Sequence, residues 1–317
     1  MIGKDVAKAK EILEKGGLVG IPTETVYGLG ANGYSAEAVL KIFAAKERPY
    51  FDPLILHFSS ISEMEEAVTS FPSKAKKLAR KFWPGPLTLV LPKKSIVPDE
   101  VTSGLNSVAV RIPRHPLTLK LLESLPFPLA APSANPFGYV SPTSAIHVED
   151  QLGDKIDYVL DGGDCSIGVE STIVSFLEAK PIILREGGVP REKIEEQIGS
   201  IDTVAISASK PLAPGMMDSH YAPRVKLTLV KDLKKYLSTN RIIEGSGLLC
   251  FKDAIAHKSS VRCVVLSQKG SVEEAASNLF RILRSFDSNK VSHIYAEMVP
   301  NNGIGRAVND RLQRASF

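Results

Sequence analysis

Residues 20–30 read Gly-Ile-Pro-Thr-Glu-Thr-Val-Tyr-Gly-Leu-Gly, and Lys-Glu-Arg-Pro follows at 46–49. We expect a short apolar strand at 18–21, a hydroxyl- and glycine-rich turn, and a helix that leads to a loop carrying Lys46 and Arg48. Backbone amides and hydroxyl groups beside two cations suit an anionic ligand. A tight turn with an unrelated pair of surface cations explains this stretch equally well.

Composition is typical of a globular protein with about two domains. The chain has 317 residues, of which 44% are apolar and 23% charged, and domains usually contain ~100–200 residues. Thirty-nine basic and 35 acidic residues give a net charge of +4. This mild excess tolerates phosphate-bearing ligands but does not by itself indicate nucleic-acid binding.

Cysteine usage and the N-terminal sequence predict a cytoplasmic protein without a membrane segment. Cys165, Cys250 and Cys263 are far apart and form no Cys-x-x-Cys pair, which argues against a zinc ribbon and a disulfide framework. The first ten residues resemble the start of an amphipathic helix and not a signal peptide. No apolar run approaches the ~20 residues that cross a bilayer.

Apolar spacing over the first ~200 residues predicts an α/β domain with a partly antiparallel sheet. Helices are expected before Gly16, after Ser35, which can act as an N-cap, and at 72–82, 117–125, 144–152 and 191–198. Strands are expected at 18–21, 53–58, 87–91, 108–112, 129–131, 158–160, 171–176 and 181–184.

The C-terminal third has a different character. Residues 207–224 contain three prolines and no helical or strand period, which is typical of a linker or an ordered crossing loop. Strands and helices then alternate, which favours a small parallel α/β domain. The expected elements are 226–230, 233–237, 248–251, 262–266, 272–286, 293–296 and 304–314.

Polar side chains follow several expected strands, and each has an ordinary structural explanation. Ser133 and Asn135 suit ligand contacts at a strand end, but local turn bonds explain them better when they are considered alone. Ser141 is either an N-cap or a phosphate contact. A buried Arg111 needs a carboxylate or phosphate partner, and a structural salt bridge is an equal alternative. His57 in an apolar strand is more often a core residue than a catalyst.

The order of motifs resembles the two-domain threonylcarbamoyl-AMP synthases, whose N-terminal half is the YrdC-like domain. The resemblance covers nearly the whole chain. It rests on the motifs that begin at Pro22, Lys46, Pro53, Trp83, Val110, Pro132, Glu170, Ala213, His220 and Gly303. It implies a YrdC-like mixed twisted sheet with helices at 1–206, a Pro-rich linker at 207–224, and a small Rossmann-like parallel α/β domain at 225–317.

The resemblance also implies roles for individual residues. Lys46 and Arg48 are implied as catalytic cations that face an open groove. Threonine-binding positions map to Thr25, His57, Arg111, Ala131 and Ser171. ATP-binding positions map to Arg48, Asp52, Ser107, Ser133, Asn135, Ser141, Arg185 and Tyr221. Two departures stand out: the family usually has Asn where this chain has Asp52, and it usually has Lys and Tyr before His220.

By this resemblance the chain is a nucleotidyltransferase that joins L-threonine, bicarbonate or CO2, and ATP into threonylcarbamoyl-AMP and pyrophosphate. Mg2+ accompanies the ATP, and tRNA threonylcarbamoyl transferase proteins use the product downstream. The linker, with Met216, Met217, His220 and Tyr221, is expected to fold over the active site; simple attachment of the two domains is the alternative.

The sequence leaves two other function classes open. A nucleic-acid-binding module is compatible with the net charge of +4, because YrdC-like domains have a basic concave face. A carbamoyltransferase of the hydrogenase-maturation type shares a YrdC-like domain, but the absence of Cys-x-x-Cys argues against it.

Overall fold

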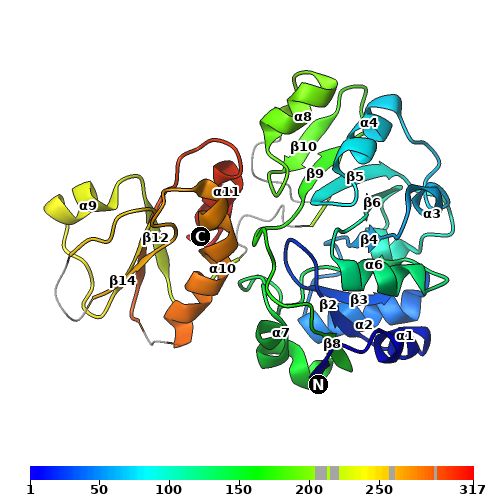
Figure 1. Cartoon of the computed structure of the whole chain (residues 1–317), viewed down its shortest axis with the longest axis horizontal. Coiled ribbons are helices and arrows are strands. Elements are labelled where there is room, and N and C mark those ends of the chain that lie inside the picture. Colours follow the sequence, from blue (N-terminus) through cyan, green and yellow to red (C-terminus); the bar gives the residue numbers. More distant parts are fainter. Residues whose placement is uncertain (204–212, 215–220, 257–260, 289–290) are drawn as a thin grey trace.

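The computed structural model describes residues 1–203, 213–214, 221–256, 261–288 and 291–317. Two separate sheets, each with its own helices, make up the described chain (Figure 1). This arrangement confirms the predicted two-part α/β architecture. The boundaries at 206 and 224 remain a prediction, since most of the linker lies outside the described residues.

The larger sheet mixes parallel and antiparallel strands. In the described residues its order is β1-β8-β2-β3-β7-β4-β6-β5-β9-β10-β11. The pairs β4–β6 and β5–β9 are parallel, whereas β5–β6 and β3–β7 are antiparallel. The strands are β1 (Ile2–Gly3), β2 (Val19–Ile21), β3 (Gly28–Asn32), β4 (Ile55–His57), β5 (Leu87–Pro92), β6 (Ser107–Arg111), β7 (Leu129–Ala130), β8 (Tyr158–Leu160), β9 (Thr172–Ser175), β10 (Ile182–Arg185) and β11 (Asp202–Thr203).

The first two helices of this domain begin at side-chain caps that the sequence offers. The Asp5 carboxylate accepts hydrogen bonds from the amides of Ala7 and Lys8, and the Ser35 hydroxyl accepts one from Ala38, which satisfies otherwise unpaired donors. The helices are α1 (Val6–Glu14), α2 (Ala36–Lys46), α3 (Ile61–Glu65), α4 (Ser73–Phe82), α5 (Asp99–Thr102), α6 (Pro116–Glu123), α7 (Ala145–Leu152) and α8 (Arg191–Ile198), with a 3-10 turn at Gly153–Lys155.

The glycine-rich stretch differs from the expected turn, because Gly28–Asn32 forms the buried strand β3. It pairs with β2 on one side and β7 on the other. A Cβ atom at Gly28 would lie 3.3 Å from the Cβ of Ala131, so the missing side chain allows a close approach. Glycine is used here for space and not for a turn.

The smaller sheet is parallel throughout its described strands, as predicted. Its order is β12-β15-β13-β14. The elements are β12 (Leu227–Val230), α9 (Leu233–Thr239), β13 (Gly247–Cys250), β14 (Arg262–Val265), α10 (Val272–Ser288), β15 (Ile294–Glu297) and α11 (Gly305–Arg314). None of the helices in the described ranges has both the length and the apolar character that a bilayer crossing requires.

Helices α10 and α11 lie between the small sheet and the larger domain, and α9 lies on the far side (Figure 1). One apolar cluster joins Val26 and Val140 of the larger domain to Phe280 and Leu283 of α10. The Tyr139 hydroxyl also donates to Asp287 at 2.5 Å. Apolar packing and polar contacts therefore both hold the two domains together.

Candidate active site

A small cavity of about 40 Å3 lies where strand ends of the larger domain meet the linker. Residues from several segments of the domain and two described linker residues form its wall. They are Thr23, Thr25, Val26, Gly28, Arg48, Ile55, His57, Arg111, Ala131, Pro132, Ser133, Glu170, Ser171, Arg185, Pro214 and Tyr221.

Most of the predicted site residues meet at this cavity. Its described lining includes Thr25, Arg48, His57, Arg111, Ala131, Ser133, Ser171, Arg185 and Tyr221. The other predicted positions are Lys46, Asp52, Ser107, Asn135 and Ser141; they are buried but do not belong to this lining. Met216, Met217 and His220 lie outside the described residues.

Arg48 is buried in an ion pair, which corrects the expectation of cations exposed in a loop. Its Nη2 lies 2.8 Å from Asp52 Oδ2 and donates to the Pro53 carbonyl at 2.9 Å, and its Nε donates to the Asp52 carbonyl at 3.0 Å. Arg48 is 6% exposed and Asp52 is fully buried. Burial raises the pKa of the Asp52 carboxyl, although the nearby cations of Arg48, Lys46 and Arg185 act in the opposite direction.

Lys46 is the last residue of α2 and is also buried, with 1% of its surface exposed. Its ammonium group donates to the carbonyl of Ser133 at 2.6 Å and to that of Asn135. Burial, and then the neighbouring Arg48, lower the Lys46 pKa well below its usual value. The loop expectation failed because the helix continues to the first cation of the motif, and the cation then points inward. Lys46 thus holds the loop that carries Ser133 in place.

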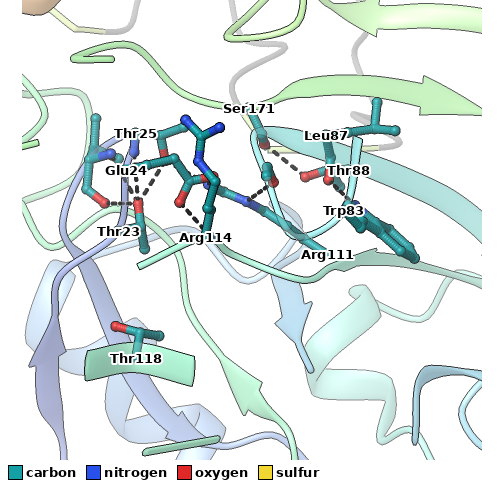
Figure 2. A network of polar contacts seen from close by, with 12 residues as sticks. Thr23, Glu24, Thr25, Trp83, Leu87, Thr88, Arg111, Arg114, Thr118 and Ser171 are labelled. Carbon is teal, nitrogen blue, oxygen red and sulfur yellow. Dashed lines mark hydrogen bonds and ion pairs between the residues drawn. The ribbon is translucent and has the colours of Figure 1, made fainter. Parts of the chain in front are cut away.

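Arg111 forms the salt bridge that the sequence left as an alternative (Figure 2). Its Nη2 donates to Glu24 Oε1 at 2.8 Å and to the Thr25 hydroxyl at 3.0 Å, and its Nε donates to the Gly85 carbonyl at 3.2 Å. The backbone amide of Arg114 donates to the other Glu24 oxygen at 2.9 Å. Burial favours the neutral acid, but Arg111 and the Arg114 amide outweigh it and lower the Glu24 pKa.

His57 is paired with Arg111 in the β4–β6 register. Burial and the Arg111 charge lower the pKa of His57 to about 3, so its imidazole is neutral near pH 7. Sequence analysis overlooked Glu24, although a buried Arg111 requires a carboxylate and Glu24 lies inside the motif that opens the site. Glu24, Thr25 and a neutral His57 together form a fixed polar wall around the guanidinium.

Arg185 connects Ser171 to the linker. It donates to the Ser171 carbonyl through Nε at 3.2 Å and Nη2 at 3.0 Å, to the Ser171 hydroxyl at 3.2 Å, and to the Pro214 carbonyl at 3.1 Å. The Thr88 hydroxyl lies 2.7 Å from that of Ser171 (Figure 2). Burial lowers the pKa of Arg185. A buried cation and the linker residue Pro214 therefore share one side of the cavity.

The second residue that sequence analysis overlooked is Glu170. Its Oε1 accepts from the Ser141 hydroxyl at 2.6 Å, and its Oε2 accepts from Arg311 Nε at 2.8 Å. Arg311 lies in α11, so this bond joins the small domain to the cavity wall. In the sequence, only the motif at 303–312 drew attention to Arg311. Nothing in the spacing of that motif indicated that its partner, Glu170, lies 141 positions away.

Comparison with known proteins gives the same organisation. The Sua5–YciO–YrdC family model, described as telomere recombination, matches residues 11–187, and a model described as the threonylcarbamoyl-AMP synthase C-terminal domain matches residues 189–316. The Pyrococcus abyssi threonylcarbamoyl-AMP synthase is 44% identical over 97% of this chain and 93% of its own length. The Bacillus subtilis synthase is 41% identical, with coverages of 98% and 92%.

A solved structure of P. abyssi Sua5 complexed with L-threonine superposes with a TM-score of 0.90 at 40% identity, and covers 100% of this chain and 97% of that one. Fold and cavity define a two-domain α/β enzyme with a YrdC-like catalytic domain. The chain belongs to the threonylcarbamoyl-AMP synthase family. It is thus an ATP-dependent enzyme of the nucleotidyltransferase type that forms threonylcarbamoyl-AMP for the threonylcarbamoyladenosine modification of tRNA. The resemblance found in the sequence is confirmed.

Proposed function

We propose that the cavity binds L-threonine and ATP side by side and joins them, with bicarbonate or CO2, into threonylcarbamoyl-AMP and pyrophosphate. One observation carries this proposal: positions expected for both substrates line the same cavity. The threonine set there is Thr25, His57, Arg111, Ala131 and Ser171, and the ATP set is Arg48, Ser133, Arg185 and Tyr221.

Arg111 is proposed to bind the threonine carboxylate. A guanidinium has five N–H donors, and the hydrogen bonds found in the described chain use three of them, toward Glu24, Thr25 and Gly85. Glu24 therefore fixes the orientation of the guanidinium, and the remaining donors are available to a planar carboxylate. The neutral His57 adds no second positive charge to this part of the site.

Arg48 and Arg185 are proposed to stabilise the phosphates. The carbamate oxygen of carbamoylated threonine attacks the α-phosphorus, the bond to the pyrophosphate oxygen breaks, and pyrophosphate leaves. This transfer needs positioning and charge stabilisation more than a protein nucleophile. Lys46 is assigned an indirect part, because its ammonium group holds the carbonyls of Ser133 and Asn135 and lies outside the cavity lining.

Mg2+ is proposed to enter as the MgATP complex, held mainly by phosphate oxygens and water. Among the described residues, no group of three or more His, Cys, Asp and Glu side chains could hold a metal ion. The site carboxylates are engaged elsewhere: Glu24 with Arg111, Asp52 with Arg48, and Glu170 with Arg311. These residues fit a metal carried by the nucleotide better than one held by the protein.

Two further parts of the proposal concern the cellular setting. The product is passed to downstream tRNA threonylcarbamoyl transferase proteins in the cytoplasm, and the net charge of +4 is compatible with direct tRNA contact. Neither part is needed for synthesis of the adenylate.

The test is one incubation of the full chain with radiolabelled bicarbonate, L-threonine and MgATP, followed by nucleotide chromatography. We expect a labelled nucleotide and release of pyrophosphate, both of which depend on threonine. Replacement of L-threonine by L-valine, which has nearly the same shape but no hydroxyl, serves as the control for substrate selectivity. Absence of a labelled nucleotide with correctly folded protein would overturn the proposal.

A further inference from the structure

Arg311 is a charged side chain of the small domain that is fully buried against the larger one. Its Nε donates to Glu170 at 2.8 Å, its Nη2 donates to the Glu186 carbonyl at 3.0 Å, and its Nη1 pairs with Asp310. A buried guanidinium is stable only when its donors are satisfied in this way. The geometry of these bonds fixes the side chain firmly relative to the catalytic domain.

Glu170 carries this contact to the cavity. It lines the cavity, its second oxygen accepts from the Ser141 hydroxyl at 2.6 Å, and its neighbour Ser171 accepts hydrogen bonds from Arg185. Loss of Arg311 would leave the Glu170 carboxylate buried without this cation, and the carboxylate would then protonate or move. Either response would change the bond to Ser141.

Tyr221 carries the second contact. Its ring stacks on Phe280 of the small domain, with ring centroids 5.7 Å apart at an interplanar angle of 25°, and the Arg311 guanidinium lies 5.0 Å from the ring centroid. Tyr221 lines the cavity and is 1% exposed. Its φ of +63° lies in the left-handed region, which is unfavourable for a tyrosine. The contacts with Phe280 and Arg311 therefore help to hold this residue in position.

We propose that Arg311 is a positioning residue for the adenylation reaction. From the small domain, it holds the side chains of Glu170 and Tyr221 in place in the cavity wall. This inference rests on the proposed function of the cavity. It gives the small domain a definite role, because Arg311 pre-forms the nucleotide side of the site. Among the described residues, Glu24, Arg111 and His57 of the larger domain form the threonine side.

Arg306 offers a matched control on the same helix. Its Nη1 pairs with Glu192 of the larger domain at 2.6 Å, so it also crosses between the domains, but neither residue belongs to the described cavity lining. If Arg311 only holds the domains together, its substitution should affect substrate binding and turnover as little as substitution of Arg306 does. If Arg311 orders the nucleotide site, its substitution should selectively impair the use of ATP.

The experiment compares Arg311→Gln with Arg306→Gln in the full chain. We expect Arg311→Gln to raise the KM for ATP or lower kcat, so that kcat/KM for ATP falls at least tenfold, while the dissociation constant for L-threonine, measured calorimetrically, stays within twofold. Arg306→Gln should leave all of these values within twofold. Equal effects of the two variants, or equal losses of ATP and threonine binding by Arg311→Gln, would overturn the proposal.

Two additional measurements keep the test decisive. If Arg311→Gln folds poorly, Arg311→Lys retains the charge but cannot span Glu170 and the Glu186 carbonyl together, and it should show the same selective loss for ATP. Binding of a non-hydrolysable MgATP analogue should weaken in the Arg311 variants independently of turnover. If the wild-type protein binds the analogue but makes no threonylcarbamoyl-AMP, the proposed function fails; if it makes product and the Arg311 variants bind the analogue normally, only this inference fails.

Discussion

Arg48 Nη2 lies 2.8 Å from Asp52 Oδ2, four residues further along the chain, and both side chains are buried beside the cavity. The Asp52 carboxylate therefore already pairs with Arg48, the cation that is proposed to bind the phosphates of ATP. An incoming phosphate has to compete with this internal counter-ion. The functional importance of Asp52 follows from this competition.

Asp52→Asn should bind ATP more tightly than the wild type, by roughly three- to tenfold, because the substitution removes a negative charge next to Arg48. Burial raises the pKa of Asp52, so wild-type affinity should also increase as the pH falls and the carboxyl takes up a proton. The variant should lack this pH dependence. Calorimetric titration with a MgATP analogue from pH 5 to pH 8 is the measurement, and Glu47→Gln is the control, since Glu47 pairs with Lys155 at the surface.

Arg48→Ala should reduce both stability and turnover. The sequence alone predicts an exposed cation whose loss leaves the melting temperature unchanged. The buried pair reverses this expectation, because removal of one partner leaves a buried charge and costs about 3–5 kcal/mol. The double variant Arg48→Ala/Asp52→Asn should regain part of the melting temperature but keep a turnover at least ~10-fold below wild type. Recovery of activity together with stability would show that Arg48 has only a structural role.

Glu24→Gln should weaken the fold and reduce its sensitivity to acid. Arg111 and the Arg114 amide hold the pKa of Glu24 below the ordinary glutamate value of 4.5. Its ion pair therefore contributes stability above about pH 4.5, and this contribution is lost as the pH falls through the lower folded pKa. Chemical denaturation gives the free energy of unfolding at pH 7 and at pH 3.5. The difference between these two free energies should be smaller for Glu24→Gln than for the wild type. Glu11→Gln, which breaks an exposed pair with Lys15, should retain the wild-type difference.

Arg111→Lys should raise the KM for threonine much more than the KM for ATP. Lysine keeps the positive charge, but it cannot bond Glu24, Thr25 and Gly85 and still present a planar pair of donors. We expect at least a ~10-fold rise in the threonine KM, with some loss of stability because Arg111 also neutralises Glu24. A parallel rise of both KM values would mark Arg111 as a purely structural partner of Glu24.

The regular elements could be predicted from sequence because their signals are local. The Ser35 cap, the apolar period before Phe82 and the alternation after residue 225 each give the correct helix or strand. Strand β3 was missed because its glycines also suit a turn, and only its close neighbour Ala131 explains their use.

The site residues could be predicted only in part. Spacing and resemblance brought together the positions that line the cavity, but they could not show that Lys46 and Arg48 turn inward. The partners Glu24 and Glu170 depend on pairings with Arg111 and Arg311, 87 and 141 positions away. Such pairings follow from tertiary packing, and no local pattern in a single sequence encodes them.

The linker should close over bound substrates. Pro214 and Tyr221 line the same cavity as the positions proposed for ATP and threonine. Ligands bound there would contact the linker at these two residues, and a linker that covers them would exclude water from the acyl-adenylate.

ATP and threonine together should protect bonds within residues 207–224 from a broad-specificity protease at least ~5-fold relative to either ligand alone, because only the filled site offers the linker its complete contact surface. Tyr221→Ala should weaken MgATP binding or release the intermediate faster, since it removes the ring held by Phe280 and Arg311. Tyr236→Ala, a change in the small domain away from the cavity, is the control. If the ligands do not change the cleavage rate and Tyr221→Ala has wild-type kinetics, the segment is a simple connector between the domains.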